Sequence, residues 1–81
     1  MKELNMDKDQ YNSELIVKAI EIAGGVQPLA RKIGVSYQTI LNWKKQRFFP
    51  SHINCMRIEQ ATEGKIKRED LLPNYPWESL R

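Results

Sequence analysis

The sequence contains few of the residues that build disulfides, metal sites and membrane spans. Its 81 residues include one cysteine and one histidine. A single cysteine cannot form an internal disulfide, and His52 with Cys55 lacks the second pair of ligands that a tetrahedral metal site needs. No stretch approaches the roughly 18 apolar residues of a membrane span, and the first residues lack the apolar run of a secretory signal. We therefore expect a cytoplasmic protein without metal or cofactor.

Patterns typical of enzymes are also missing. A domain of this length buries roughly 60% of its unfolded surface, which leaves little room for a deep substrate cleft. Gly24-Gly25 is followed by Val-Gln-Pro and not by the Lys-Ser/Thr pair of a phosphate-binding loop. The sequence shows no obvious carboxylate that could act as a catalytic partner of His52. The chain is therefore expected to be a binding protein and not an enzyme.

Acidic residues are absent from the middle of the chain. Residues 22–58 contain six lysines and arginines and no Asp or Glu, whereas residues 1–21 have a net charge of −2 and residues 59–81 of −1. A surface that faces DNA phosphates needs cations without neighbouring acids. A basic face that only contacts solvent would have the same composition, so charge alone leaves DNA binding open.

Apolar residues recur at helical spacing in short segments, and no segment shows the alternation typical of a strand. Ser13 is expected to cap a first helix, which Gly24-Gly25 ends. A second helix of barely two turns has Pro28 in its first turn and ends before Gly34. The candidate core positions of these two helices are Leu15, Ile16, Ala19, Ile20, Ala23, Leu29, Ala30 and Ile33.

Two further helices are expected after these. Ser36 caps a third helix that runs to about Gln46, and Ser51 caps a fourth that ends near Gly64. Residues 69–72 have the pattern of a single helical turn, and prolines make the rest of the C-terminal segment irregular. The candidate core positions of the fourth helix are Ile53, Met56, Ile58 and Ala61.

The second and third helices have the spacing of a helix-turn-helix. Such a unit needs a small residue where the helices cross, a residue free to adopt positive φ in the turn, and apolar anchors. These roles fall to Ala30, Gly34, Ile40 and Trp43. A helical hairpin without a nucleic-acid role is the alternative. We predict an all-α domain of four to five helices with a helix-turn-helix, comprising a flexible arm (1–12), the DNA-binding domain (13–74) and a C-terminal tail (75–81).

A series of motifs runs along the chain: Gly24-Gly25, Ala30, Gly34-Val35, Trp43, Pro50, the segment 58–64, Arg68-Glu69-Asp70-Leu71 and Pro73. In these motifs the chain resembles the Cro-type phage repressors and the related YdaS-type helix-turn-helix family, which includes candidate antitoxins. The resemblance covers about residues 14–77, and Glu63 departs from it because a second glycine is usual there. It implies a lambda-repressor-like fold and a small, phage- or prophage-encoded regulator that binds operator DNA, often as a pair of subunits.

The third helix is expected to enter the major groove with its N-terminal half at the base edges. Glutamine and asparagine can pair with adenine, leucine can contact a thymine methyl, and a tyrosine can instead bond to a phosphate. Exposed polar residues without a reading role are the alternative. The candidates for base contact are Tyr37, Gln38, Leu41 and Asn42. The candidates for phosphate contact are Gln27, Ser36, Thr39, Lys44, Lys45 and Arg47.

Two binding functions remain open at this point. The first is a sequence-specific DNA-binding regulator of prophage type, and the second is an antitoxin that binds a toxin protein and autoregulates its operon. One helix reads few base pairs, so a weak homodimer that forms on DNA is expected. The candidate contacts are Phe48-Phe49 and the tail residues Tyr75-Pro76-Trp77 with Leu80. Alternatively, the tail aromatics fold back onto their own domain.

Overall fold

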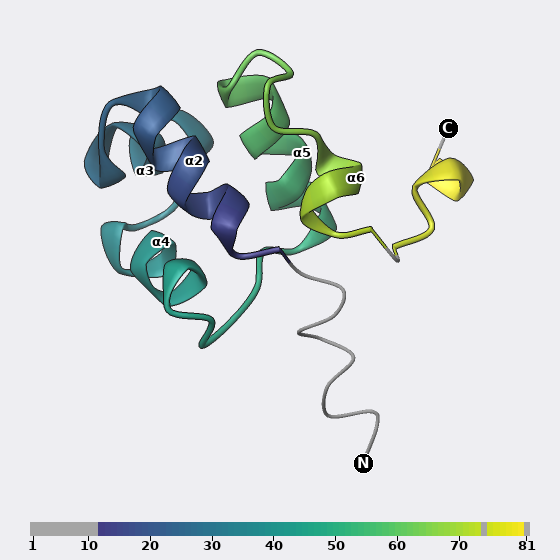
Figure 1. Cartoon of the computed structure of the whole chain (residues 1–81), viewed down its shortest axis with the longest axis horizontal. Coiled ribbons are helices and arrows are strands. Elements are labelled where there is room, and N and C mark those ends of the chain that lie inside the picture. The colour runs from purple at the N-terminus through teal and green to yellow at the C-terminus, as the bar shows by residue number, and fades with distance from the viewer. Residues whose placement is uncertain (1–11, 74, 81) are drawn as a thin grey trace.

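The computed structural model describes residues 12–73 and 75–80, which form a small helical domain (Figure 1). Within these residues there are five α-helices, a 3-10 helix and no strand, so the predicted all-α class is confirmed. No helix in this part of the chain is long and apolar enough to cross a membrane. The predicted arm lies, apart from Asn12, outside the described residues. The elements are α2 (Glu14–Ala23), α3 (Val26–Ile33), α4 (Tyr37–Lys44), α5 (His52–Ala61), α6 (Arg68–Leu71) and the 3-10 helix η1 (Trp77–Leu80).

Serine side chains cap two of the three helices for which a serine cap was predicted. The Ser36 hydroxyl accepts a hydrogen bond from the backbone N–H of Thr39 at 3.1 Å, and Ser51 caps α5 in the same way. The prediction was wrong for Ser13, whose side chain makes no capping bond. The Ser13 backbone is already helical, and the first N–H of α2 is satisfied instead by the side chain of Asn12.

Two helices end earlier than predicted, and both ends have a residue with positive φ. Helix α4 stops at Lys44, and Gln46 follows with φ 64°. Helix α5 stops at Ala61, and Glu63 and Gly64 follow with φ 56° and 82°. A left-handed residue cannot continue a right-handed helix, so these positions terminate it.

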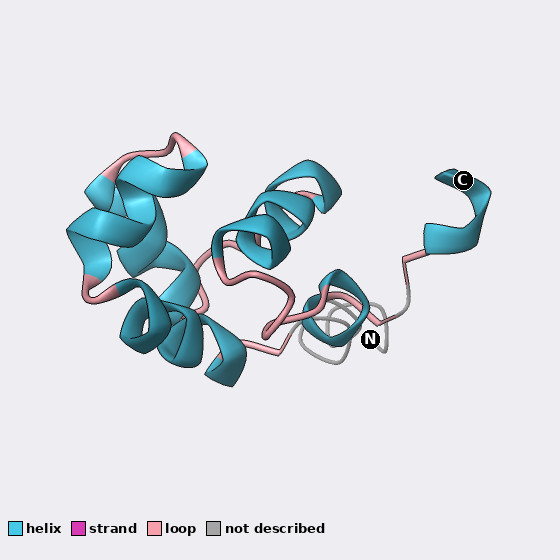
Figure 2. Cartoon of the chain, turned by 90° about the horizontal axis from the view of Figure 1, so that it is seen from above, coloured by secondary structure: helices cyan, strands magenta, loops and turns pink. Residues whose placement is uncertain are grey.

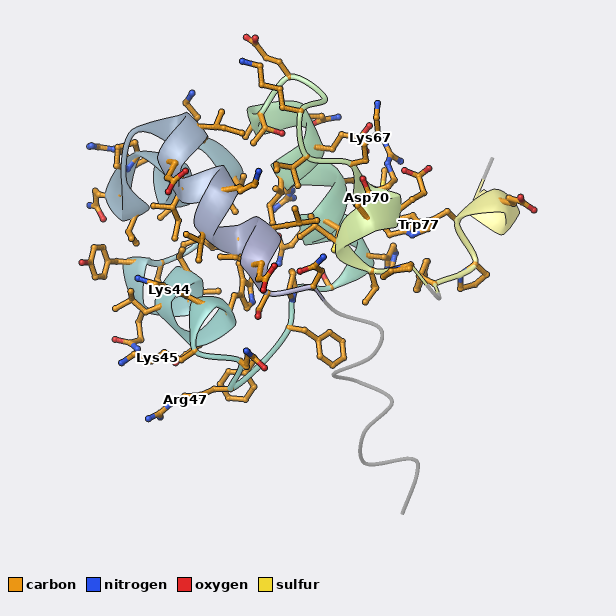
Figure 3. The ribbon with its side chains drawn as sticks, viewed as in Figure 1. Lys44, Lys45, Arg47, Lys67, Asp70 and Trp77 are labelled. Carbon is orange, nitrogen blue, oxygen red and sulfur yellow. The ribbon has the colours of Figure 1, made fainter. Side chains whose placement is uncertain are left out.

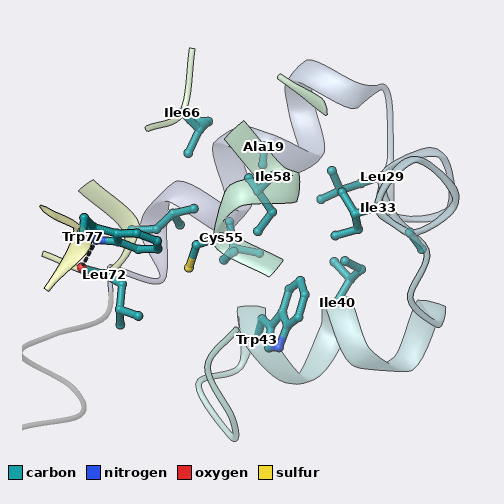
Figure 4. Packing of buried hydrophobic residues seen from close by; sticks show 13 residues of the cluster. Ala19, Leu29, Ile33, Ile40, Trp43, Cys55, Ile58, Ile66, Leu72 and Trp77 are labelled. Carbon is teal, nitrogen blue, oxygen red and sulfur yellow. Dashed lines mark hydrogen bonds between the residues drawn. The ribbon is translucent and has the colours of Figure 1, made fainter. Parts of the chain in front are cut away.

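A single buried cluster joins all the helices (Figure 4). Helix α3 is central to it, because it packs against α2, α4 and α5, while α6 packs against α5. Figures 1 and 2 show α2, α3 and α4 gathered at one end of the molecule and η1 at the opposite end. The buried members are Ile16, Ala19, Leu29, Ala30, Ile33, Ile40, Trp43, Cys55, Ile58, Ile66, Leu71, Leu72 and Trp77.

The inner face of α5 differs from the prediction at one position. Ile53 was expected in the core, but its side chain is 50% exposed, while Cys55 is fully buried. Residues two apart on a helix point about 200° away from each other, so both cannot face the core. Cys55, Ile58 and Thr62 lie at spacings of three and four residues, and they form the buried face.

The C-terminal residues pack on their own domain. Trp77 is buried, and its indole N–H donates to the Leu72 carbonyl at 2.9 Å. The Tyr75 ring lies 4.8 Å from the Trp77 ring and stacks on His52. The expectation of an irregular end was wrong for residues 77–80, which form η1. The buried Trp77 and the half-buried Tyr75 packed against it agree with the alternative in which the tail aromatics fold back onto their own domain.

Candidate nucleic-acid interface

A tight turn at Gly34 joins α3 to α4. Gly34 has φ 78°, and its N–H and that of Val35 both donate to the Ala30 carbonyl, at 2.9 and 3.0 Å. A Cβ atom added at Gly34 would meet no heavy atom within 4 Å. Glycine is therefore favoured here by the backbone conformation and not by lack of space. This turn fixes where α4 begins relative to α3.

Buried anchors fix which face of α4 is turned outward. Ile40 and Trp43, on α4, are 0% and 3% exposed, and Ala30 on α3 is 3% exposed. Figure 4 shows the Ile40 and Trp43 side chains directed from α4 into the buried cluster. Because this stripe is buried, the opposite face of the eight-residue helix is turned toward solvent.

The four candidates for base contact lie on the outward part of α4. Tyr37 is 51% exposed and Gln38 is exposed, whereas Leu41 and Asn42 are half-buried one turn later. Leu41 does not belong to the buried cluster. The Gln38 side chain donates from Nε2 to Oδ1 of Asn42 at 3.3 Å. The two amides predicted to read bases are therefore bonded to each other.

Two of the predicted phosphate ligands are likewise paired. The hydroxyl oxygens of Ser36 and Thr39 lie 2.8 Å apart at the N-terminus of α4, within hydrogen-bond distance. One hydroxyl proton is shared between them, so the other proton remains available to an outside acceptor. Gln27 is exposed in the first turn of another helix, α3. No acidic residue lies in the first turn of α3 or of α4, so neither turn repels an anion.

The three predicted phosphate-contacting cations gather at the C-terminal end of α4. Lys44, Lys45 and Arg47 are exposed, and Figure 3 shows them together on the outer side of the molecule. Lys67, the residue before α6, and Asp70, within α6, lie on the other side of the molecule. The outward face of α4 thus combines amide and hydroxyl groups with positive charge, which is the composition that contacts to bases and phosphates require.

Arg57 was not assigned a role by the sequence. From α5, its guanidinium donates to the carbonyl of Ile33, the last residue of α3, at 3.4 Å. Carbonyls at a helix end have no partner within the helix, and a cation is favourable there. Arg57 therefore links α5 to the helix that precedes the turn. The one sequence feature that points to Arg57 is its position in residues 22–58, which contain no Asp or Glu.

His52 and Cys55 make contacts typical of core residues. The His52 ring stacks on Tyr75, with ring centroids 4.8 Å apart. Burial raises the pKa of the Cys55 thiol to about 12, so its thiolate form is disfavoured at neutral pH. The described residues hold no group of three or more potential metal ligands.

Comparison with known proteins places the chain among bacterial and phage proteins. The model of the family described as bacterial toxin YdaS matches residues 16–80. The chain is 35% identical over 77 residues to YdaS of Escherichia coli strain K12, named as a candidate transcriptional regulator; the match covers 94% of this chain and 74% of the relative.

Two further relatives have regulatory names. The regulatory protein Cro of Pseudomonas phage D3 is 39% identical over 51 residues, which cover 63% of this chain and 70% of that protein. An uncharacterised HTH-type transcriptional regulator of Haemophilus influenzae is 33% identical over 75 residues, covering 83% of this chain and 31% of the relative. No solved structure gives a significant match. Because the family match extends over most of its length, the chain belongs to the YdaS family.

Proposed function

We propose that this protein is a transcriptional regulator that binds double-stranded DNA through the outward face of α4. The observation that carries the proposal is the division of α4 into two faces. Ile40 and Trp43 are buried, whereas Gln38, on the opposite side of the helix, is exposed. A short helix held in this way can enter the major groove without exposing core residues. The names of the Cro, YdaS and HTH-type relatives agree with it.

In this proposal the side chains divide into two roles. Tyr37, Gln38, Leu41 and Asn42 face base edges and provide sequence preference. Phosphate contacts hold the helix in place and provide affinity that depends on salt. The residues in this second group are Gln27, Ser36, Thr39, Lys44, Lys45 and Arg47. Because binding and not catalysis explains both groups, the protein is not expected to be an enzyme.

Two copies are proposed to bind adjacent half-sites. One eight-residue helix spans too few base pairs to select an operator among genomic competitors. Among the candidates for the subunit contact, Phe48 and Phe49 are 63% and 41% exposed, whereas the Trp77 ring is buried within the chain. Sedimentation with an operator-length duplex should show two protomers per duplex, and a single protomer per duplex would contradict pairing.

The alternative is an antitoxin whose main partner is a toxin protein, and the salt dependence of DNA binding tests whether DNA phosphates are contacted at all. The chain would be titrated into randomised duplexes at several salt concentrations, with Lys45→Gln as the variant and Lys67→Gln, on the opposite side, as the matched control. Loss of one phosphate contact should reduce the slope of log K against log salt by about 0.9 for Lys45→Gln and leave it unchanged for Lys67→Gln. A wild-type slope near zero would contradict DNA binding and favour a protein partner.

A further inference from the structure

Two side-chain amides on the outward face of α4 are joined to each other. Gln38 and Asn42 are four residues apart, about one helical turn, and Gln38 Nε2 donates to Asn42 Oδ1 at 3.3 Å. Neither side chain makes another hydrogen bond within the residues that the structure describes. Within this part of the chain, the bond is therefore the polar contact that holds the two amides in place.

The two side chains differ in how freely they can move. Asn42 is half-buried and short, whereas Gln38 is exposed and has one more rotatable bond. Side chains on a helix lean toward its N-terminus, so Asn42 presents its oxygen over the turn that carries Gln38. Asn42 is therefore the anchor of the pair, and the bond restricts the amide of Gln38.

The bond leaves the groups that pair with a base unoccupied. A side-chain amide has two N–H donors and an oxygen with two lone pairs. Gln38 uses one N–H, so its other N–H and its oxygen remain, which are the donor and acceptor that adenine N7 and N6 require. Asn42 keeps both N–H groups and one lone pair. The bond thus does not decide which base either amide can pair with, but it decides how the Gln38 amide is oriented.

Orientation matters because adenine must be met by a donor and an acceptor at the same time. The terminal torsion of a free glutamine is broad and roughly two-fold, so its oxygen and nitrogen exchange places. An amide that is already oriented loses less conformational freedom when it pairs. An oriented Gln38 should therefore discriminate adenine from other bases better than a free one.

Building on the proposed function, we propose that Asn42 is a positioning residue, which orients the Gln38 amide to read an adenine. Asn42 acts through its side-chain oxygen, and this role is separate from any contact that its N–H groups make with DNA. The role needs only an acceptor at position 42. Aspartate, which is nearly the same size as asparagine and accepts but does not donate when ionised, should therefore fulfil it.

The test begins with selection by the wild-type chain from duplexes with a randomised central segment. The position read by Gln38 is the one at which Gln38→Ala loses a preference for adenine. Discrimination is the Kd of duplexes with another base at this position divided by the Kd of the duplex with adenine. A good contact discriminates about 5- to 150-fold, and a ratio within one protein cancels a uniform change of affinity.

Two substitutions of Asn42 separate positioning from direct contact. Asn42→Ala removes the oxygen and should reduce discrimination at the Gln38 position by about 2- to 10-fold, the equivalent of one hydrogen bond. Asn42→Asp keeps an acceptor without an N–H donor, so it should retain this discrimination although its charge weakens binding to every duplex. Gln60→Ala, an exposed glutamine on α5, is the matched control and should behave as the wild type.

Two results would overturn the positioning role. The first is unchanged discrimination in Asn42→Ala, because the Gln38 amide would then need no orientation. The second is an equal loss in Asn42→Asp and Asn42→Ala, because the N–H groups of Asn42 and not its oxygen would then matter. Thermal unfolding followed by circular dichroism confirms that the variants are folded at the temperature of the titrations.

The same experiment separates this inference from the proposed function. If Gln38→Ala abolishes a preference for adenine that Asn42→Ala leaves intact, the positioning role is wrong and DNA reading by α4 stands. If a sequence is enriched but no position loses an adenine preference in Gln38→Ala, the positioning role is again wrong, because Gln38 then has no contact to orient. If no sequence is enriched from the library, both are wrong, because no base is then read.

Discussion

The imidazole ring of His52 stacks on the phenol ring of Tyr75, with ring planes 11° apart. His52 opens α5, and Tyr75 comes after α6, so the contact closes the C-terminal segment onto the domain. Trp77 extends the aromatic cluster, with its ring 4.8 Å from that of Tyr75, and its indole N–H donates to Leu72. Leu72 and Trp77, with Tyr75 packed against them, are therefore part of the hydrophobic core.

Trp77→Ala should lower the free energy of unfolding by about 3–5 kcal/mol, because it removes a large buried side chain. Trp77→Phe is the comparison variant, because it keeps a buried aromatic ring but loses the bond to Leu72 and part of the indole volume. Its cost should lie between about 1 kcal/mol and that of Trp77→Ala. Both are measured by denaturant unfolding followed by circular dichroism. Unaltered stability of Trp77→Ala would show that the segment is not part of the core.

Glu59 should make stability depend on pH. Burial alone would raise its pKa, but hydrogen bonds from the Arg68 side chain and backbone, with the Arg68 charge, hold the pKa below its ordinary value of 4.5. A lowered pKa means that the carboxylate stabilises the fold above about pH 4.5 and that this contribution is lost as the pH falls through the folded-state pKa.

The variant that tests this is Glu59→Gln. Its melting temperature should lie below that of the wild type at pH 7, and the two should converge in acid, where the wild-type carboxyl is protonated. Glu21→Gln, an exposed carboxylate on α2, serves as the control and should follow the wild type. A difference between Glu59→Gln and the wild type that stays constant with pH would contradict the ion pair.

Substitution of Gly34 should destabilise the turn before α4 through the backbone alone. Gly34 has φ 78°, and an added Cβ would have no atom within 4 Å. Gly34→Ala should therefore lower the free energy of unfolding by about 1–2 kcal/mol through backbone strain alone. Gly34→Asn should cost less, because asparagine tolerates this conformation, and Gly34→Val more, because its side chain is β-branched. Urea unfolding would measure the series. Equal losses for asparagine and valine would argue against a left-handed residue at this position.

Glu63→Gly should stabilise the protein by about 1 kcal/mol, since Glu63 has φ 56° without being a glycine. Glu63→Ala provides the control, because it removes the charge but retains a Cβ, and it should give no gain. A differential-scanning measurement compares the melting temperatures. A gain in Glu63→Ala equal to that in Glu63→Gly would assign the effect to charge and not to the backbone.

The parts of the fold that depend on local patterns could be predicted from the sequence. The stripe of α2, the cap at Ser36 and the end of α3 at Gly34 each depend on neighbours within one or two helical turns. Residue type and spacing determine these features, so sequence is sufficient. The predicted roles of Gln38 and Asn42 toward DNA remain predictions.

Features that depend on distant partners were not predictable. Ile66 stands alone between lysines, yet its side chain is buried in the core cluster. Its N–H donates to the Thr62 hydroxyl, and Arg68, two residues later, is paired with Glu59. The ion pair between Glu59 and Arg68, nine residues later, produces no periodic pattern in the sequence. The Gln38–Asn42 bond has the spacing of many exposed pairs on helices, so only the structure identifies it.

The central claim, that the outward face of α4 reads DNA, is tested most directly by a ratio of two dissociation constants. The chain is titrated against a duplex enriched by selection and against the same duplex with its sequence scrambled. Combining Gln38→Ala with Asn42→Ala should reduce the preference for the selected duplex by about 5-fold or more and leave affinity for the scrambled duplex unchanged. An equal fall in affinity for both duplexes, or no change for either, would contradict the claim.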